Sequence, residues 1–202
     1  MAATADPGLV DASGPGSPGR WVLLAYRVPR EPSTPRIAIW RGLKRLGVAQ
    51  LADGLVALPA DTRTREQLEW VAQDVLEAAG SAGVWLAQPT TAAQERQLAR
   101  AMMDARAAEY ASIVRQAQTA MTAGTAGTIT PVQQAGIARR LRGELRRIMR
   151  RDYFPPAERE AARIALEALT RTVHERDQRE QRGQNDQGDQ QDQWDQREVT
   201  QP

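Results

Sequence analysis

Residues 20–60 read RWVLLAYRVPREPSTPRIAIWRGLKRLGVAQLADGLVALPA, and this stretch decides the fold. The run WVLLAYRV is apolar on both alternating faces except at Arg27, which is typical of a strand in the middle of a sheet. Thr34 and Pro35 predict a helix start, with the threonine hydroxyl as the cap and the proline in the first turn. Gly47 predicts the end of that helix. The stretch therefore begins with a buried strand followed by a short helix.

The same stretch continues into a hairpin and a second helix. Asp53 and Gly54 predict a two-residue hairpin turn, because glycine readily adopts a positive φ angle. Asp61 predicts the cap of a helix that ends at Gly80. Residues 84–87 form a short apolar run that predicts a buried strand. The order strand, helix, strand, strand, helix, strand is the ferredoxin-like arrangement.

The whole chain is predicted to be an α+β protein with two folded parts. We expect a ferredoxin-like βαββαβ domain over residues 20–88 and an α-helical unit over residues 91–176. Residues 1–19 are rich in Pro, Gly, Ala and Ser, and residues 177–202 are rich in Gln and Asp, so we expect a disordered leader and a disordered tail.

The helical unit is predicted to contain three helices, at about 91–120, 131–152 and 156–176. The first is rich in alanine, and small side chains permit close approach of helices. The second and third each carry an apolar stripe, and we expect them to pack as an antiparallel hairpin. The stripe of the second helix consists of Ile137, Leu141, Leu145 and Ile148.

Composition excludes several classes of function. The chain has no cysteine and a single histidine, His174, so disulfides and thiolate sites are excluded and a histidine-based metal site is unexpected. We find no nucleophile motif and no cofactor motif, and we predict no metal site, no cofactor and no enzymatic activity. No apolar run is long enough to span a bilayer, and the N-terminus lacks the features of a signal peptide, so we expect a cytoplasmic protein.

The net charge of +2 is unevenly distributed along the chain. Residues 177–202 hold seven acidic residues and three arginines, so the body of the chain is strongly basic. A basic body indicates an anionic partner such as DNA. We also hypothesise that the flexible acidic tail folds back over the basic helix at 131–152 and competes with DNA phosphates.

That helix is the first candidate DNA-binding element. One side of it is dominated by arginine, and Glu144 is its single acidic residue before Asp152. The candidate phosphate contacts are Arg139, Arg142, Arg146, Arg147 and Arg150, together with Arg41, Lys44 and Arg45 on the helix after the first strand. The alternative interpretation is an ordinary solvated helix face.

The turn after the first strand is a candidate oxyanion site. Arg30, Ser33, Thr34 and Arg36 surround a predicted helix N-terminus, where free amides, hydroxyls and guanidinium groups favour a tetrahedral anion such as chromate or phosphate. The alternative is a capped helix start with surface arginines.

The tryptophans give a further prediction about surfaces. Trp21, Trp40 and Trp85 fall in the sheet domain and are predicted to belong to the core. Trp70 lies off the apolar face of its helix and is a candidate contact for a partner.

Several of these segments carry a family resemblance. The VPREPS turn at 28–33, the LPA end of the hairpin at 58–60 and GVWLAQ at 83–88 resemble the N-terminal domain of the chromate-resistance regulator ChrB. The pattern continues in Glu109-Tyr110 and in RDYF at 151–154, and it covers roughly residues 20–172. A looser resemblance extends to the ferredoxin-like domain of the repressor PaaX.

The resemblance implies a transcriptional regulator of chromate resistance that binds DNA, with chromate or a similar oxyanion as a possible effector. We expect a homodimer, because operator sites often have two-fold symmetry. Similar full-length regulators carry a second, C-terminal domain, which we expect to be replaced here by the low-complexity tail.

Two other classes of function stay open. The chain can be an interaction module that docks a separately encoded partner resembling the C-terminal domain. It can also be a metal-dependent nuclease of ferredoxin-like fold, although that class requires an acidic ligand near the end of the first strand, where Arg27 and Arg30 stand.

Overall fold

The computed structural model describes the backbone of residues 19–198 and the side chains of residues 19–179. The predicted leader lies outside the described residues except for Gly19, and so does the end of the predicted tail at 199–202.

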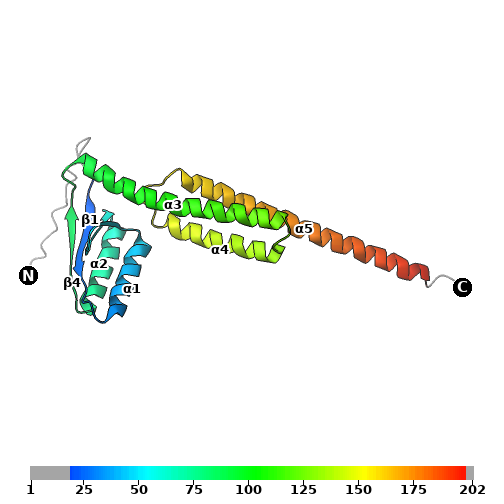
Figure 1. The fold of residues 1–202 in the computed structure, drawn as a ribbon, viewed down its shortest axis with the longest axis horizontal. Coiled ribbons are helices and arrows are strands. Elements are labelled where there is room, and N and C mark those ends of the chain that lie inside the picture. Colours follow the sequence, from blue (N-terminus) through cyan, green and yellow to red (C-terminus); the bar gives the residue numbers. More distant parts are fainter. Residues whose placement is uncertain (1–18, 199–202) are drawn as a thin grey trace, which may run out of the picture. The chain divides into compact units, whose positions relative to one another are not determined.

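Four strands form one antiparallel sheet with the order β2-β3-β1-β4. The strands are β1 (Trp21–Arg27), β2 (Ala49–Ala52), β3 (Leu55–Pro59) and β4 (Ser81–Ala87). The two connecting helices, α1 (Ser33–Leu46) and α2 (Thr62–Glu77), lie on the same side of the sheet in Figure 1. The predicted βαββαβ fold is therefore confirmed.

Strand β1 lies in the middle of the sheet, as predicted. It pairs with β3 on one side and with β4 on the other. Val22 and Leu24 are fully buried and belong to one core cluster with Leu68 and Val75 of α2. Because side chains alternate along a strand, these residues define the sheet face that the helices cover.

The hairpin between β2 and β3 turns at Asp53-Gly54, as predicted. Gly54 has a φ angle of 73°, and a Cβ atom at this position would lie 2.3 Å from the carbonyl oxygen of Tyr26. The amide of Tyr26 donates to the carbonyl of Gly54 over 2.7 Å. Glycine is therefore required here both by the backbone angle and by the close approach of β1.

Helix α1 ends as predicted but begins differently. Gly47 adopts the left-handed conformation at the C-terminus, and its amide donates to the carbonyls of Leu43 and Lys44. The helix begins at Ser33, so Thr34 lies inside the first turn and its predicted role as the cap was wrong. Pro32 occupies the cap position and no side chain caps the helix.

Helix α2 has the cap that the sequence predicts. The Asp61 carboxylate accepts from the Thr64 amide over 2.6 Å, and the Asp61 amide donates to the Thr64 hydroxyl over 3.0 Å. This reciprocal pair satisfies two amides of the first turn. The Thr64 hydroxyl also donates to the carbonyl of Pro59 over 2.6 Å, which fixes the end of β3 against the start of the helix.

The end of α2 uses alanine where glycine is usual. Ala79 has a φ angle of 56°, and its amide and that of Gly80 donate to the carbonyls of Leu76 and Val75. Gly80 follows the left-handed residue and is needed for another reason. A Cβ atom there would lie 2.4 Å from the carbonyl oxygen of Arg27, where β4 begins beside β1.

Three helices follow the sheet: α3 (Ala92–Thr125), α4 (Pro131–Met149) and α5 (Glu158–Glu198). Helix α4 begins as predicted with Pro131 in its first turn, after a Thr130 cap whose hydroxyl accepts from the Gln133 amide over 3.2 Å. Among residues 19–198, no helix combines the length and apolar character needed to cross a bilayer.

The chain forms two compact units. Of the described residues, the first unit contains residues 19–104 and Arg151–Phe154, and the second contains Ala105–Arg150 and residues 155–198. The division falls inside α3, at Asp104, and not at residues 89–90 between the two predicted parts. That residues 20–88 and residues 91–176 form two separate domains stays a prediction.

The second unit is a three-helix arrangement with a small-residue core. Ala117 and Ala120 of α3 pack with Ala138 and Leu141 of α4 and with Leu166 and Leu169 of α5. Tyr110, Ile113, Ile148 and Ala162 form a second buried cluster. The predicted packing of α4 on α5 is confirmed, and the alanines allow the close approach that the sequence indicated.

Helix α5 is longer than predicted. We expected it to end near Arg176 and to be followed by a disordered tail, but it continues to Glu198. Its last part is rich in Gln, which favours helix once a packed segment has nucleated it. The flexible tether on which the tail hypothesis depends is therefore not seen between residues 177 and 198.

Four residues between α4 and α5 belong to the first unit, and their contacts explain part of the RDYF motif. The Tyr153 hydroxyl donates to the carbonyl of Leu46 over 3.2 Å, and the Arg151 guanidinium donates to the carbonyl of Lys44 over 2.9 Å. Phe154 stacks on Trp21 with 6.1 Å between ring centroids. The end of α1 and the start of β1 are thus covered by a distant segment.

We predict that Ala79→Gly raises the free energy of unfolding by about 0.5–1 kcal/mol, because a left-handed residue with a Cβ atom is disfavoured by about 1–2 kcal/mol. The measurement is denaturant unfolding. The neighbouring variant Gly80→Ala should instead destabilise the protein, because its Cβ meets the Arg27 carbonyl. A destabilising Ala79→Gly variant would contradict the observed end of α2.

Candidate nucleic-acid interface

The packing of α4 determines which of its arginines face solvent. Gln134, Ala138, Leu141 and Ile148 are buried, and the Gln134 amide is satisfied by the carbonyl of Ala120 over 3.1 Å. With about 100° between successive residues, the opposite side of the helix is the arginine-rich one. Burial of the apolar stripe therefore places the arginines on the surface.

Arg139, Arg146 and Arg147 are exposed and have no ion-pair partner among the side chains of residues 19–179. Arg150 is exposed at the end of the helix. Arg140 is held by Glu144 over 3.6 Å and by Gln116 over 2.9 Å. We call Arg139, Arg146, Arg147 and Arg150 the α4 arginine surface.

Arg142 differs from the other predicted phosphate contacts of α4 and is left out of this surface, so its phosphate contact stays a prediction. It is partly buried, and its guanidinium donates to the Thr170 hydroxyl of α5 over 2.7 Å. It follows directly after the buried Leu141, so it lies at the flank of the apolar stripe. Its role in the structure is a contact between α4 and α5.

Some arginines on other helices are neutralised by nearby acids. Arg65 pairs with Glu69 over 2.8 Å, and Arg163 pairs with both Glu160 and Glu167. The hydrogen bond from Arg163 lowers the pKa of Glu160 below its usual value. Such pairs at i,i+3 and i,i+4 are typical of solvated helix faces, and Arg139, Arg146 and Arg147 of α4 lack one among the described side chains.

The basic residues of α1 are also on the surface. Arg41, Lys44 and Arg45 are exposed. The Lys44 ammonium lies 5.1 Å from the centre of the Trp40 ring, a favourable cation–π distance. Since α1 and α4 belong to different units, we treat these residues as a separate candidate surface.

The predicted oxyanion site is open at the start of α1. Arg30, Ser33, Thr34 and Arg36 are all exposed. The first turn has no side-chain cap and no acidic residue, so its amides are not occupied by a side chain of that turn. These residues supply the donors that an oxyanion needs, and anion binding here stays a prediction.

Two of the three tryptophans predicted to be in the core are on the surface. Trp21 is buried, whereas Trp40 is 52% exposed and Trp85 is 64% exposed. Trp40 lies beside the buried stripe of α1, and Trp85 lies on edge strand β4, on the face opposite to Val84. Trp70 is 73% exposed, as its position off the apolar face indicated.

The first unit contains a hollow that was not predicted from the sequence. Its arginines, Arg96 and Arg100, stand one turn apart on α3, and Phe154 of the RDYF motif forms another wall. The i,i+4 spacing of the two arginines is visible in the sequence and could have indicated a basic site. The hollow itself could not be predicted, because Phe154 is distant from the arginines in sequence.

No group of three or more His, Cys, Asp or Glu side chains that could hold a metal ion occurs among the residues whose placement is described. The end of β1, where a nuclease of this fold would need an acidic ligand, carries Arg27.

Comparison with known proteins assigns the region from α1 into α3 to a family. Residues 36–123 match the family model described as "Protein ChrB, N-terminal". Residues 36–123 belong to the ChrB N-terminal family. The chain is also 33% identical over 144 residues to the protein named "Protein ChrB" from Cupriavidus metallidurans, an alignment that covers 70% of this chain and 43% of that protein. The ChrB resemblance is confirmed, while the looser one to PaaX stays a prediction.

The chain thus spans less than half the length of the ChrB relative that it matches. The family match runs from α1 into α3 and stops before α4. The α1 basic residues and the Arg96–Arg100 pair therefore lie inside the ChrB N-terminal region, and the α4 arginine surface lies beyond the matched residues.

We predict that Arg142→Ala and Arg146→Ala have different effects on stability. Arg142→Ala should lower the free energy of unfolding by about 1–2 kcal/mol, because it removes the charged hydrogen bond to Thr170. Arg146→Ala should change it by less than about 0.5 kcal/mol, as is usual for surface sites. Thermal or denaturant unfolding decides this, and equal losses in the two variants would contradict the assignment.

Proposed function

We propose that the chain is a chromate-resistance-associated transcriptional regulator that binds DNA through the α4 arginine surface. The observation that carries the proposal is the set of exposed arginines at positions 139, 146 and 147 without acidic partners among the described side chains. Arginine suits phosphate because its planar donors match two oxygens at once. The family relationship to ChrB supports the regulatory part of the proposal.

In this proposal the phosphate contacts supply affinity, and base readout comes from an element that is not assigned. The α1 residues Arg41, Lys44 and Arg45 are the second candidate contact surface. The protein acts in the cytoplasm without enzymatic chemistry. Chromate or a similar oxyanion is its effector, and the exposed start of α1 is the candidate site for it.

The test is DNA affinity measured over a range of salt concentrations. We expect Arg139→Gln with Arg146→Gln to weaken binding by roughly tenfold or more at low salt. The slope of the logarithm of the affinity against the logarithm of the salt concentration should fall by about 0.9 for each lost phosphate contact. The DNA upstream of the chain's own gene, with and without chromate, is the specific substrate.

The matched control is Arg65→Gln with Arg163→Gln, which changes the net charge equally but removes arginines that are already paired with acids. It should bind DNA nearly as tightly as the parent protein. If both double variants lose affinity equally, net charge and not the α4 arginine surface determines binding. A salt-independent affinity would contradict direct phosphate contact altogether.

We also propose that the regulator is a homodimer formed through edge strand β4. This strand is seven residues long and contains neither a charge nor a proline, the usual devices that block edge pairing. Trp85 and Leu86 are 64% and 48% exposed, and they point to opposite faces of the sheet. The other edge, β2, is four residues long and irregular in register, so it is a poorer template.

Trp85→Lys should shift the molar mass in solution from dimer to monomer, because it places two like charges at the shared edge. Sedimentation equilibrium gives the mass. Trp70→Lys is the matched control, since Trp70 is also highly exposed but lies on α2. A parent protein that is monomeric, or a Trp85→Lys variant that stays dimeric, would contradict this interface.

A second candidate function is an interaction module for a separately encoded partner. The 73% exposure of Trp70 favours it, because a large exposed aromatic side chain often marks a protein contact. This function predicts that a partner co-purifies with the protein and that Trp70→Lys releases it. The module alone would then have no DNA affinity of its own.

A further inference from the structure

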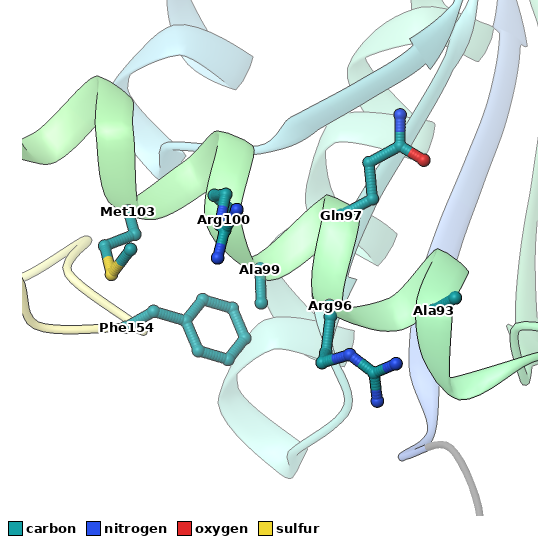
Figure 2. A pocket seen from close by; sticks show the side chains of 7 residues that line it. All are labelled: Ala93, Arg96, Gln97, Ala99, Arg100, Met103 and Phe154. Atoms are coloured by element: carbon teal, nitrogen blue, oxygen red, sulfur yellow. The ribbon is translucent and has the colours of Figure 1, made fainter.

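The first unit contains a hollow of about 500 Å³ beside the start of α3. Its lining residues are Ala93, Arg96, Gln97, Ala99, Arg100, Met103 and Phe154, which Figure 2 shows from close by. The volume lies within the range of about 300–1,000 Å³ that is usual for small-molecule sites. All of the lining residues belong to the first unit, which ends on α3 at Asp104 and includes Phe154.

The apolar wall of the hollow is held in place by other contacts. In Figure 2 the Phe154 ring lies beneath α3, on the side to which Met103 points. The ring stacks on Trp21 at 6.1 Å, with 29° between the ring planes. The neighbouring Tyr153 is anchored to the carbonyl of Leu46. The wall is therefore formed before any ligand arrives, which reduces the entropic cost of binding.

The rim of the hollow carries two cations that the protein itself does not neutralise. Arg96 and Arg100 stand at i and i+4 on α3, a spacing at which like charges repel. Neither has an ion-pair partner among the side chains of residues 19–179. The adjacent Glu95 accepts from the Gly19 amide over 2.7 Å. A bound anion would relieve the repulsion between the two guanidinium groups.

We propose that this hollow binds a small organic anion that has a flat apolar body and a carboxylate or sulfonate group. The body packs against Phe154, Met103 and the small side chains of Ala93 and Ala99. The anionic group lies between Arg96 and Arg100, whose donor geometry matches two oxygens. A bare inorganic oxyanion gains nothing from the apolar wall, so the ligand class differs from that predicted for the start of α1.

The binding site itself is independent of DNA binding. Only its role as an effector site rests on the proposed regulatory function. The experiment is therefore a binding measurement without DNA, so that its failure and the failure of the DNA-binding proposal are distinguishable.

The probe is anilinonaphthalene sulfonate, whose fluorescence rises when its rings leave water. We expect saturable binding at one site per chain. Arg96→Gln with Arg100→Gln should weaken binding about tenfold, because about 1.4 kcal/mol is then shared by two exposed ion pairs, each within the usual range of strength. The matched control is Arg115→Gln with Arg171→Gln, two exposed arginines outside the hollow, and it should bind as the parent does.

Competition then tests the ligand class. Naphthoate should displace the probe, whereas the neutral naphthylmethanol and inorganic sulfate should displace it at least about tenfold less effectively. Phe154→Leu, which keeps an apolar side chain but removes the ring, should weaken binding of the probe and of naphthoate. Circular dichroism of each variant checks its fold.

The proposal is overturned if the parent protein shows no saturable binding, or if both double variants bind as tightly as the parent. Equal displacement by sulfate and naphthoate would show a plain anion site and would also overturn it. If the Arg115/Arg171 control loses as much affinity as the Arg96/Arg100 variant, the loss is a general charge effect. That result would also overturn the proposal.

Discussion

The core of the sheet unit is completed by Tyr153 and Phe154, which come from the segment between α4 and α5. Tyr153 is hydrogen-bonded to the carbonyl of Leu46, 107 positions earlier in the chain, and Phe154 stacks on the buried Trp21. Without these side chains, Trp21 and the end of α1 would lose part of their apolar cover. The same segment supplies a wall of the hollow beside α3, so one packing arrangement completes the core and shapes the proposed anion site.

A second constraint shapes the candidate interface. Helix α4 buries Leu141 and Ile148 between its neighbours, and this burial leaves Arg139 and Arg146 facing water. Burying an apolar side chain stabilises a protein by about 1.5–3 kcal/mol, whereas an exposed ion pair is worth about 0–1 kcal/mol. The apolar stripe therefore fixes the orientation of the helix, and the arginines are available for a partner because they contribute little to the fold.

The sheet unit could be predicted largely from sequence because its signals are local. Asp61, Gly47 and Gly54 act through hydrogen bonds and backbone angles of near neighbours, and each was placed as the structure has it. Three features depended on distant residues or on packing and were missed. The Thr170 partner of Arg142 and the Trp21 partner of Phe154 have no signal in local periodicity. The exposure of Trp85 depends on β4 being an edge strand, which composition does not reveal.

The central claim is that unpaired arginines of α4 contact DNA phosphates, and arginine-specific chemical modification tests it most directly. The protein would be treated with phenylglyoxal with and without duplex DNA, and each arginine would be quantified by mass spectrometry. The account predicts that DNA protects Arg139, Arg146 and Arg147, while Arg65 reacts equally in both conditions. Unchanged modification of the α4 arginines when DNA is bound, with protection of Arg41 and Arg45 instead, would contradict it.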